Sequence, residues 1–208
     1  LLAKNKGWNV FVSDFGAIKA SFQSELKEAN LEFESGKHSE ERILSADLIV
    51  KSPGIPDSAP IIKKANENGI KVISEIEFAG YYLKAKTICI TGSNGKTTTT
   101  LMTHHILKNA GLNVGIAGNI GQSLARQVVT ENFDWYVLEL SSFQLDGMFE
   151  FKADISILLN ITPDHLDRYN NSMDEYADSK MRITQNQNSN DWFIYNADDK
   201  VIVEKLKQ

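Results

Sequence analysis

The sequence predicts an α/β protein built from mainly parallel sheets with helices on their faces. Short apolar runs alternate with mixed polar and apolar helical stretches along the 208 residues, which is typical of parallel strands joined by crossover helices. A glycine-rich loop, TGSNGKTTTT at 91–100, lies between an apolar run and a helical stretch. Hydrophobic residues make up 42% of the chain, enough for a packed core, so the composition argues against a disordered chain.

The first part of the chain predicts a Rossmann-like domain over residues 1–84. Strand signals lie at 9–14, 46–54 and 71–74, and helical stretches are FQSELKEAN (22–30) and APIIKKANENG (59–69). Gly69 closes the second helical stretch, as glycine commonly does just after a helix. The boundary with the next domain is expected between Tyr82 and Lys86.

The second part predicts a P-loop ATPase-type central domain over 85–208, again with a mainly parallel sheet. Strand signals lie at 87–91, 113–118, 135–140, 154–160 and 191–196. The stretch at 96–111 predicts a helix, because Met102, Ile106 and Ala110 recur at helical spacing. A further helix is predicted over 172–187, where Ser172 and Glu175 have the spacing of a capping box.

Composition and charge narrow the class of partner. Acidic and basic residues are mixed and give a formal net charge of -5, which argues against nucleic acid as the main partner. Cys89 is the single cysteine, so no intramolecular disulfide can form and a reducing cytoplasm is expected. No apolar stretch approaches the length of a membrane span. The first residues, LLAKNKG, are typical of a helix end closed by Gly7, so we expect a fragment that starts inside a folding unit.

The loop after the strand at 87–91 predicts a phosphate site. The common loop G-x-x-x-x-G-K-[ST] would place glycine at 90, where Ile90 stands. The strand–loop–helix context still seats an anion on unpaired N–H groups, with Lys96 as the cation and the Thr97 hydroxyl as a Mg²⁺ ligand. The position of the loop between a strand and a helix favours a phosphate site over a plain tight turn with a surface lysine. The nucleotide-binding residues are then Gly92, Ser93, Asn94, Gly95, Lys96, Thr97 and Thr98.

Three further side chains are candidates for metal binding or catalysis. Glu139 ends an apolar strand beside the loop, where an acid can reach Mg²⁺ rather than simply face solvent. His165 lies among acids after another strand and is either a metal ligand or an ordinary loop histidine. Lys180 falls on the apolar face of its predicted helix. Its ammonium either reaches the rim or, in a site of low dielectric, has a depressed pKa, so that the neutral amine can react with CO₂.

The segments that carry these residues resemble the Mur ligase family of ATP-dependent ligases. The loop TGSNGKT resembles the family's phosphate loop, which lacks the first glycine, and NITPDHLDRY (160–169) and SKMR (179–182) resemble two further segments. LELSSFQL (138–145) is similar to the branch that adds D-glutamate to UDP-N-acetylmuramoyl-L-alanine. The resemblance implies two Mg²⁺ ions held by Thr97, Glu139, His165 and a carbamylated Lys180.

The same resemblance implies substrate-binding residues. In the central domain, Asn119, Ser141, Gln144 and His165 would contact the muramoyl substrate. In the first domain, strand-end loops would hold the UDP group, with Asp14, Ser52 and Gly54 as the candidates. Phe15 and Gly16 follow Asp14 where family members often carry threonine and arginine, which puts the diphosphate contact of this loop in question.

The implied reaction is formation of an amide bond through an acyl phosphate, in peptidoglycan precursor synthesis and hence in cell-wall biogenesis, cell shape and cell division. Its partners would be UDP-N-acetylmuramoyl-L-alanine, D-glutamate and ATP, with catalysis by Lys96, Glu139, His165 and Lys180. Alternatives are another Mur-type or a folylpolyglutamate-type ligase, a P-loop switch that binds GTP, and an NAD-binding module. A third, C-terminal domain of the family is absent from these residues, so ligase turnover by them alone is not expected.

Overall fold

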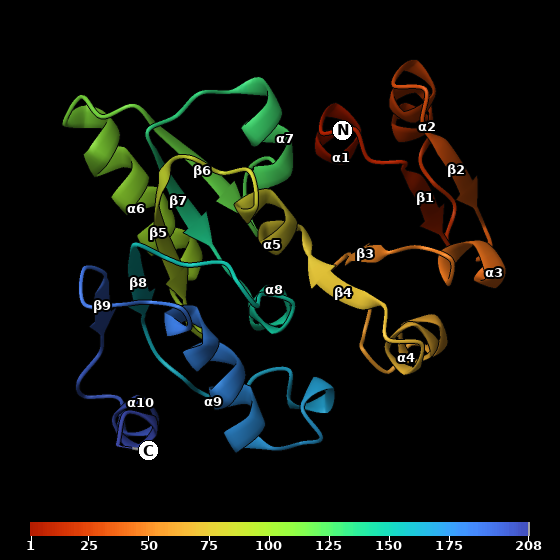
Figure 1. The fold of residues 1–208 in the computed structure, drawn as a ribbon. Coiled ribbons are helices and arrows are strands. Elements are labelled where there is room, and N and C mark those ends of the chain that lie inside the picture. The colour runs from red at the N-terminus through yellow and green to blue at the C-terminus, as the bar shows by residue number, and fades with distance from the viewer. Residues whose placement is uncertain (208) are drawn as a thin grey trace. The chain divides into compact units, whose positions relative to one another are not determined.

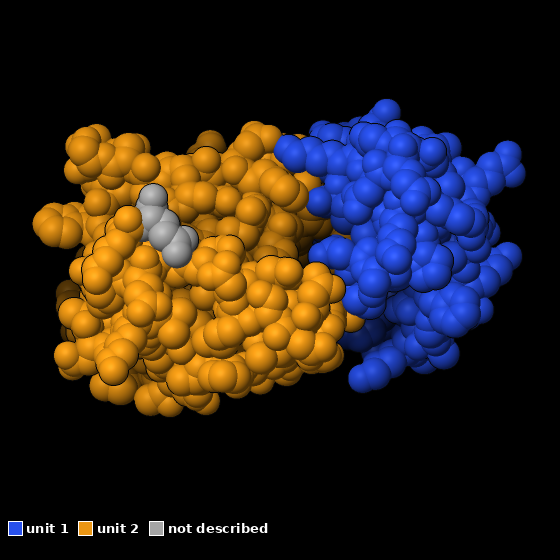
Figure 2. All heavy atoms as spheres, turned by 90° about the horizontal axis from the view of Figure 1, so that it is seen from below, with its two compact units in different colours: residues 1–50, 56–72 blue, residues 51–55, 73–208 orange. Residues whose placement is uncertain are grey.

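The structure, a computed structural model, describes residues 1–207; residue 208, the last of the predicted central domain, lies outside them. The chain divides into two compact units, residues 1–50 with 56–72 and residues 51–55 with 73–208 (Figure 2). The predicted boundary between residues 84 and 85 stays a prediction. Within residues 1–207, no helix is long and apolar enough to cross a membrane.

The smaller unit contains short strands and helices in alternation. They are α1 (Leu2–Asn5), β1 (Phe11–Asp14), α2 (Ala20–Glu28), β2 (Glu32–Ser35), α3 (Glu40–Ile43), β3 (Leu48–Lys51), α4 (Pro60–Glu67) and β4 (Lys71–Ser74), the last residues of β3 and β4 belonging to the larger unit. β1 pairs with β2 in parallel, and β3 pairs with β4 (Figure 1). The predicted strand positions at β1, β3 and β4 are therefore confirmed.

Strand β2 was not predicted, because its sequence EFES alternates acids with other residues. The structure shows how one of those acids is accommodated. Glu34 is only 8% exposed and accepts hydrogen bonds from the Ser39 N–H (2.8 Å), the Ser39 hydroxyl (2.6 Å) and the Ser13 hydroxyl (2.7 Å). Burial alone would raise the pKa of Glu34, but these hydrogen bonds outweigh it and lower the pKa to about 2.

The larger unit is built on a five-stranded parallel sheet of order β6-β7-β5-β8-β9 (Figure 1). Its strands are β5 (Lys86–Thr91), β6 (Val114–Gly118), β7 (Trp135–Glu139), β8 (Ile155–Leu158) and β9 (Trp192–Tyr195). Its helices are α5 (Glu75–Gly80), α6 (Lys96–Asn109), α7 (Leu124–Thr130), α8 (Ser142–Asp146), α9 (Met173–Met181) and α10 (Lys200–Lys205), with short 3₁₀ turns at Leu166–Arg168 and Arg182–Thr184. All five predicted strands are present, so the mainly parallel α/β fold is confirmed.

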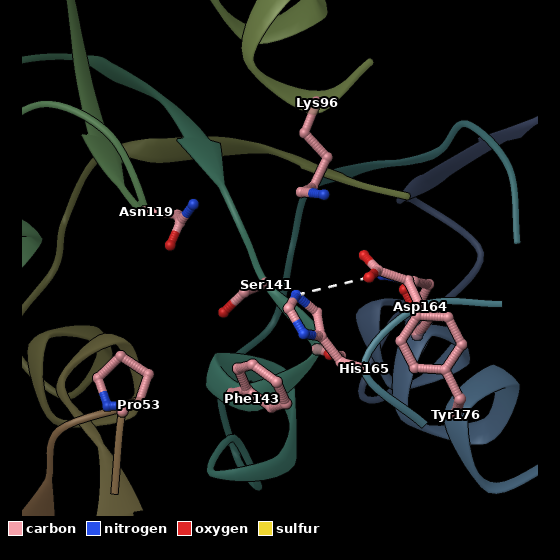
Figure 3. A pocket seen from close by; sticks show the side chains of 11 residues that line it. Pro53, Lys96, Asn119, Ser141, Phe143, Asp164, His165 and Tyr176 are labelled. Atoms are coloured by element: carbon pink, nitrogen blue, oxygen red, sulfur yellow. Dashed lines mark ion pairs between the residues drawn. The ribbon is translucent and has the colours of Figure 1, made fainter. Parts of the chain in front are cut away.

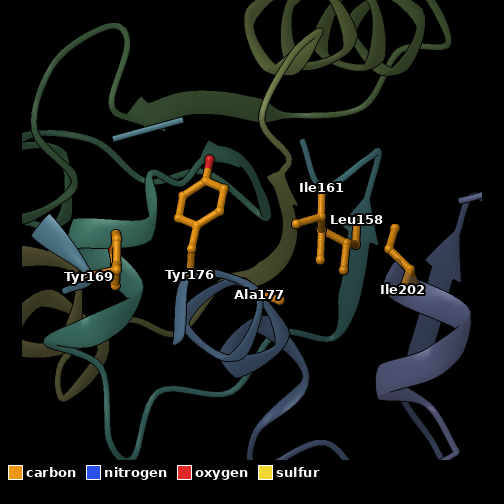
Figure 4. Close-up of a cluster of buried hydrophobic side chains, with 6 residues drawn as sticks. All are labelled: Leu158, Ile161, Tyr169, Tyr176, Ala177 and Ile202. Carbon is orange, nitrogen blue, oxygen red and sulfur yellow. The ribbon is translucent and has the colours of Figure 1, made fainter. Parts of the chain in front are cut away.

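Helices pack on both faces of this sheet. On one face, Leu107 of α6 packs against a cluster from β5, β6 and β7 that contains Ile88, Ile90, Val114 and Val137. On the other face, α9 and α10 pack over β8, and the buried cluster there contains Leu158, Ile161, Tyr169, Tyr176, Ala177 and Ile202 (Figure 4). Because parallel strands end at the same edge of the sheet, the loops after β5, β6, β7 and β8 are brought together at one edge.

The helix predicted at 96–111 is present as α6, but the spacing that predicts it does not identify its buried face. In α6, the apolar side chains at helical spacing do not face the sheet: Met102 is 58% exposed and Ile106 is 60% exposed. The sheet-facing side of this helix instead carries Thr100, which is fully buried, and Leu107. The spacing predicted the helix correctly but not its buried face, because polar residues occupy most of that face.

The helix predicted at 172–187 is shorter, and α9 ends at Met181. Only half of its predicted capping box forms. The Ser172 hydroxyl accepts the N–H of Glu175 (3.2 Å), but the Glu175 carboxylate accepts from the Asn170 amide (3.0 Å). The Ser172 N–H that a full box would use donates instead to the Tyr169 carbonyl (2.7 Å).

A buried carboxylate joins α5 to the loop after α8. Glu77 is fully buried, and its two oxygens accept the backbone N–H groups of Phe149 (3.0 Å), Glu150 (2.9 Å) and Phe151 (2.9 Å). Three N–H donors on one carboxylate satisfy a buried charge that would otherwise be costly. Glu77 therefore fixes the loop at 149–151 against α5.

Replacing Glu77 by glutamine is expected to lower the free energy of unfolding by about 2–4 kcal/mol, because one acceptor oxygen is lost and buried N–H groups lose their partner. Urea denaturation of Glu77→Gln measures this loss. Glu204→Gln, on an exposed residue of α10, is the matched control and should change stability by less than about 0.5 kcal/mol. Equal effects of the two substitutions would contradict the structural role of Glu77.

Candidate active site

A cavity of about 250 Å³ lies at the edge where the strands of the larger unit end (Figure 3). Its lining combines two lysines with polar and aromatic side chains: Pro53, Gly54, Lys96, Asn119, Ser141, Ser142, Phe143, Asp164, His165, Tyr176 and Lys180. Lys96, Asn119, Ser141 and His165 come from four different segments and surround the same space in Figure 3. The parallel topology thus collects chemically useful groups that are far apart in sequence.

The phosphate loop connects β5 to the first turn of α6. Gly95 has a left-handed backbone (φ 84°) and precedes the helix, a conformation that glycine adopts without the strain of a side chain. The first helical hydrogen bond of α6 runs from Thr99 N–H to the Gly95 carbonyl (3.0 Å). The N–H groups of Lys96, Thr97 and Thr98 therefore precede the helical bonding pattern, as the N–H groups of an anion site at a helix start do.

Two lysines meet at one carbonyl of this loop. The Lys96 ammonium donates to the carbonyls of Gly92 (2.8 Å) and Ser93 (3.0 Å). The Lys180 ammonium donates to the same Gly92 carbonyl (3.0 Å). Lys96, the predicted phosphate-binding cation, and Lys180, which the family resemblance associates with a second metal, therefore both bond to this loop.

Lys180 is buried rather than extended to the rim of the protein. It is 2% exposed, and its ammonium lies over the Tyr176 ring, 4.7 Å from the centroid. Burial, with a further contribution from the charge of Lys96, lowers the pKa of Lys180 to about 7, although Asp164 and Asp146 act in the opposite direction. A large fraction of this amine is thus neutral near physiological pH, which is the form that reacts with CO₂.

Glu139 ends β7 with one satisfied and one unsatisfied carboxylate oxygen. The residue is 1% exposed; Oε1 accepts from the Asn119 amide (2.7 Å), and the Asn119 N–H donates to the Glu139 carbonyl (2.8 Å). Among residues 1–207, Oε2 has no hydrogen-bond partner. A buried carboxylate oxygen of this kind is costly unless a cation binds it, so Glu139 fits a Mg²⁺ ligand.

Close backbone contact brings Glu139 and Asn119 together. β6 and β7 pair so that Gly118 lies opposite Glu139, and a Cβ at Gly118 would lie 2.2 Å from the Glu139 carbonyl oxygen. Gly118 also has φ 101°. Only glycine fits both constraints, so the strand ends can approach closely enough for Asn119 to bond Glu139.

His165 lies on the wall of the cavity with an exposed side chain. Its backbone is left-handed (φ 50°), its ring centroid is 5.4 Å from that of Phe143, and Nε2 is 3.7 Å from Asp164 Oδ1. Within residues 1–207, no group of three or more His, Cys, Asp or Glu side chains is placed to hold a metal ion.

The other predicted site residues are placed as follows. Ser141 lines the cavity, but the Gln144 side chain accepts from the Ser141 N–H and hydroxyl (both 3.0 Å) and forms a capping box at the start of α8. Gly54 lines the cavity, whereas Ser52 does not. Asp14 ends β1 in the smaller unit, where its Oδ1 accepts the Gly16 N–H (2.8 Å).

The remaining predictions in the phosphate loop lie outside the cavity lining. Asn94, Thr97 and Thr98 are exposed, whereas Ser93 is buried. The cavity lining also contains five residues that were not predicted from the sequence, namely Pro53, Ser142, Phe143, Asp164 and Tyr176. Two of them had a usable signal. Asp164 precedes His165, and Tyr176 lies one helical turn before Lys180, so both share their neighbour's surroundings.

Comparison with known families and relatives gives a consistent match over both parts of the chain. The model described as Mur ligase middle domain matches residues 90–208, and the model described as Mur ligase MurD-like, N-terminal domain matches residues 2–74. The UDP-N-acetylmuramoylalanine–D-glutamate ligase of Bacteroides fragilis is 60% identical over 206 residues, covering 99% of this chain and 46% of the relative. The same-named protein of Cytophaga hutchinsonii is 59% identical and covers 97% of this chain and 45% of the relative. The chain therefore spans about half the length of these relatives.

Solved structures resemble the fold at lower identity. A murein peptide ligase from Psychrobacter arcticus has a TM-score of 0.57 at 20% identity, covering 99% of this chain and 47% of that one. A UDP-N-acetylmuramate:L-alanyl-γ-D-glutamyl-meso-diaminopimelate ligase from Neisseria meningitidis has a TM-score of 0.61 at 18% identity, covering 99% and 68%. The middle-domain match covers more than half of the chain and includes the phosphate loop, Glu139, His165 and Lys180. The chain belongs to the Mur ligase family.

Proposed function

We propose that this chain is the substrate- and ATP-binding part of a ligase that adds D-glutamate to UDP-N-acetylmuramoyl-L-alanine, in peptidoglycan precursor synthesis. The observation that carries the proposal is that Lys96, Asn119 and Lys180 line one cavity, and that Asn119 is bonded to the buried Glu139, which is not itself a lining residue. The names of the relatives, which are 54–60% identical in the examples from B. fragilis and Christiangramia forsetii, support the choice of D-glutamate as the amino acid. The cytoplasm remains the proposed location, since the chain's single thiol is free and buried.

In the proposed reaction, the substrate carboxylate attacks the γ-phosphorus of ATP and gives an acyl phosphate and ADP. The amine of D-glutamate then attacks the acyl carbon, phosphate leaves with the bonding electrons, and the amine loses a proton as the amide forms. Lys96 and the N–H groups at the start of α6 bind and orient the phosphates. Such phosphoryl transfer depends on alignment and charge neutralisation more than on covalent chemistry by the protein.

Glu139 Oε2 and the Thr97 hydroxyl would hold the Mg²⁺ at the nucleotide. When bound, Mg²⁺ neutralises phosphate charge and fixes the phosphate oxygens. The neutral Lys180 amine would attack the carbon of CO₂ and release one proton, which leaves a carbamate whose oxygens, with His165, can hold a second Mg²⁺. Asn119 holds Glu139 Oε1, so that Oε2 remains the oxygen for the cation.

The amino acid that the enzyme accepts distinguishes this function from that of other ligases in the superfamily. With the full-length protein, ATP and UDP-N-acetylmuramoyl-L-alanine, D-glutamate is expected to trigger phosphate release, whereas L-lysine and meso-diaminopimelate are not. A malachite-green phosphate assay with each amino acid measures this selectivity. If D-glutamate fails while L-lysine or meso-diaminopimelate succeeds with a longer precursor, the assignment to the D-glutamate branch is wrong.

A further inference from the structure

The phosphate loop is fastened to the segment that follows β8, and we call these contacts the Asn160 latch. The latch comprises the hydrogen bonds that join Ser93 and Asn94 to Asn160 and Thr162. Ser93 N–H donates to the Asn160 carbonyl (3.0 Å), the Ser93 hydroxyl donates to the Thr162 carbonyl (2.8 Å), and Thr162 N–H donates to the Ser93 hydroxyl (2.9 Å). The Asn94 side chain donates to the Thr162 hydroxyl (3.2 Å).

The side chain of Asn160 makes the most specific contact of the latch. Its Oδ1 accepts the Asn94 N–H (2.9 Å), and its Nδ2 donates to the Asn94 carbonyl (3.0 Å). The two bonds fix the orientation of the amide, since only Oδ1 can accept and only Nδ2 can donate. The side chain thus pairs with Asn94 as a neighbouring strand would, and it extends the β5–β8 pairing, which ends at Thr91 and Leu158, into the loop.

The latch determines which backbone N–H groups of the loop are available to bind a phosphate. The Asn94 N–H is bonded to Asn160, so the donors left for an anion are those that follow it at Gly95, Lys96, Thr97 and Thr98. A loop of this kind binds an anion well only if its peptide planes are ordered before the ligand arrives, because ordering them on binding costs conformational entropy. Ile90 stands where the common loop has its first glycine, and it belongs to β5, so the loop itself is shorter. Hydrogen bonds from Asn160, outside the loop, therefore help to hold its shape.

We infer that Asn160 is a positioning residue for nucleotide binding, which holds the Asn94 peptide so that the N–H groups at the start of α6 converge on a phosphate. The inference rests on the proposed function for the presence of a nucleotide at this loop. Asn160 touches the loop backbone, so it acts through Asn94 and not on the reacting atoms. The same segment continues through Thr162 to Asp164 and His165, so the latch also ties the phosphate loop to the far wall of the cavity.

The test compares Asn160→Ala with Thr162→Val in the 208-residue chain, with Mg²⁺·ADP as the probe. The valine variant removes only the hydroxyl that accepts the Asn94 side chain and leaves the Thr162 backbone bonds in place. Isothermal titration calorimetry is expected to show a roughly 10- to 100-fold weaker Kd for Asn160→Ala, because two hydrogen bonds that order the loop are lost. Thr162→Val is expected to change the Kd by less than about threefold. An unchanged Kd in Asn160→Ala would overturn the inference.

Amide hydrogen exchange provides a readout that does not require nucleotide. In Asn160→Ala, peptides covering 92–98 should exchange faster than in the wild-type chain, while peptides covering β6 and β7 should not change. Asn160→Asp keeps the acceptor for the Asn94 N–H and replaces the alanine variant in this experiment if that variant does not fold. The exchange rate at 92–98 should then increase by less than the loss of both hydrogen bonds would cause. If the wild-type chain binds no ADP, the proposed function fails, and unchanged exchange at 92–98 would separately overturn the latch.

Discussion

Glu139→Gln is expected to lower ligase turnover of the full-length protein by roughly 10²–10⁴-fold, since charge neutralisation by a metal contributes several kcal/mol and each 1.4 kcal/mol is tenfold in rate. Glutamine is nearly isosteric with glutamate, and its carbonyl oxygen can still accept from the Asn119 amide, as Glu139 Oε1 does. The change therefore affects mainly Oε2, which has no hydrogen-bond partner within the described residues. An amide nitrogen cannot replace it as a cation ligand.

Two measurements separate loss of the metal ligand from damage to the fold. Mn²⁺ binding in the presence of ADP, followed by electron paramagnetic resonance, should weaken in Glu139→Gln together with turnover. The thermal midpoint should stay the same or rise, because a buried charge has been removed. A variant that retains full turnover and Mn²⁺ affinity would show that Glu139 does not hold the metal.

Lys180→Met is expected to abolish turnover and at the same time to stabilise the protein. The wild-type ammonium is buried, and methionine fills a similar volume without a charge, so a gain of about 1–3 kcal/mol is expected at pH 6. Activity should not return with added bicarbonate, because methionine cannot form a carbamate. Chemical denaturation of both proteins measures the difference in stability.

The stability difference should depend on pH with a defined sign. Burial lowers the pKa of Lys180 to about 7 in the folded protein, from an ordinary value of 10.5. The unfolded chain thus binds more protons between these values, and the cost of burying the lysine is fully present below pH 7 and fades as the pH rises toward 10.5. The advantage of Lys180→Met should shrink from pH 6 to pH 9. An advantage that is constant across this range, with full activity, would contradict the role of a buried reactive lysine.

The strand pattern and the phosphate loop were the most predictable features of this chain. Strands β5 to β8 are apolar runs because helices cover both faces of this part of the sheet, so local sequence is enough to locate them. The edge strand β9 is also apolar in sequence, although Trp192, Ile194 and Tyr195 are exposed. The burial of Lys180 was also accessible, since its helical position places it on the face that carries Tyr176 and Ala177. In both cases the periodicity of one element determines the result.

The remaining features depend on contacts between distant segments. The Asn119–Glu139 bond forms because β6 and β7 pair in one particular register, which no single element encodes. Gln144 and Ser141 were assigned to the substrate by resemblance, and the structure adds a capping role for both that their spacing could have suggested. The spacing of Met102 and Ile106 locates α6 but does not identify its buried face, because Thr100 and not a larger apolar residue faces the sheet.

The most direct test of the account is the position of a divalent cation in crystals of this chain grown with Mn²⁺ and ADP. Anomalous scattering locates Mn²⁺ without reference to the protein. A peak is expected about 2 Å from Glu139 Oε2, in contact with a phosphate oxygen that is bound by the loop at 92–97. A nucleotide bound at that loop with its Mn²⁺ out of reach of Glu139, or a nucleotide bound elsewhere, would contradict it.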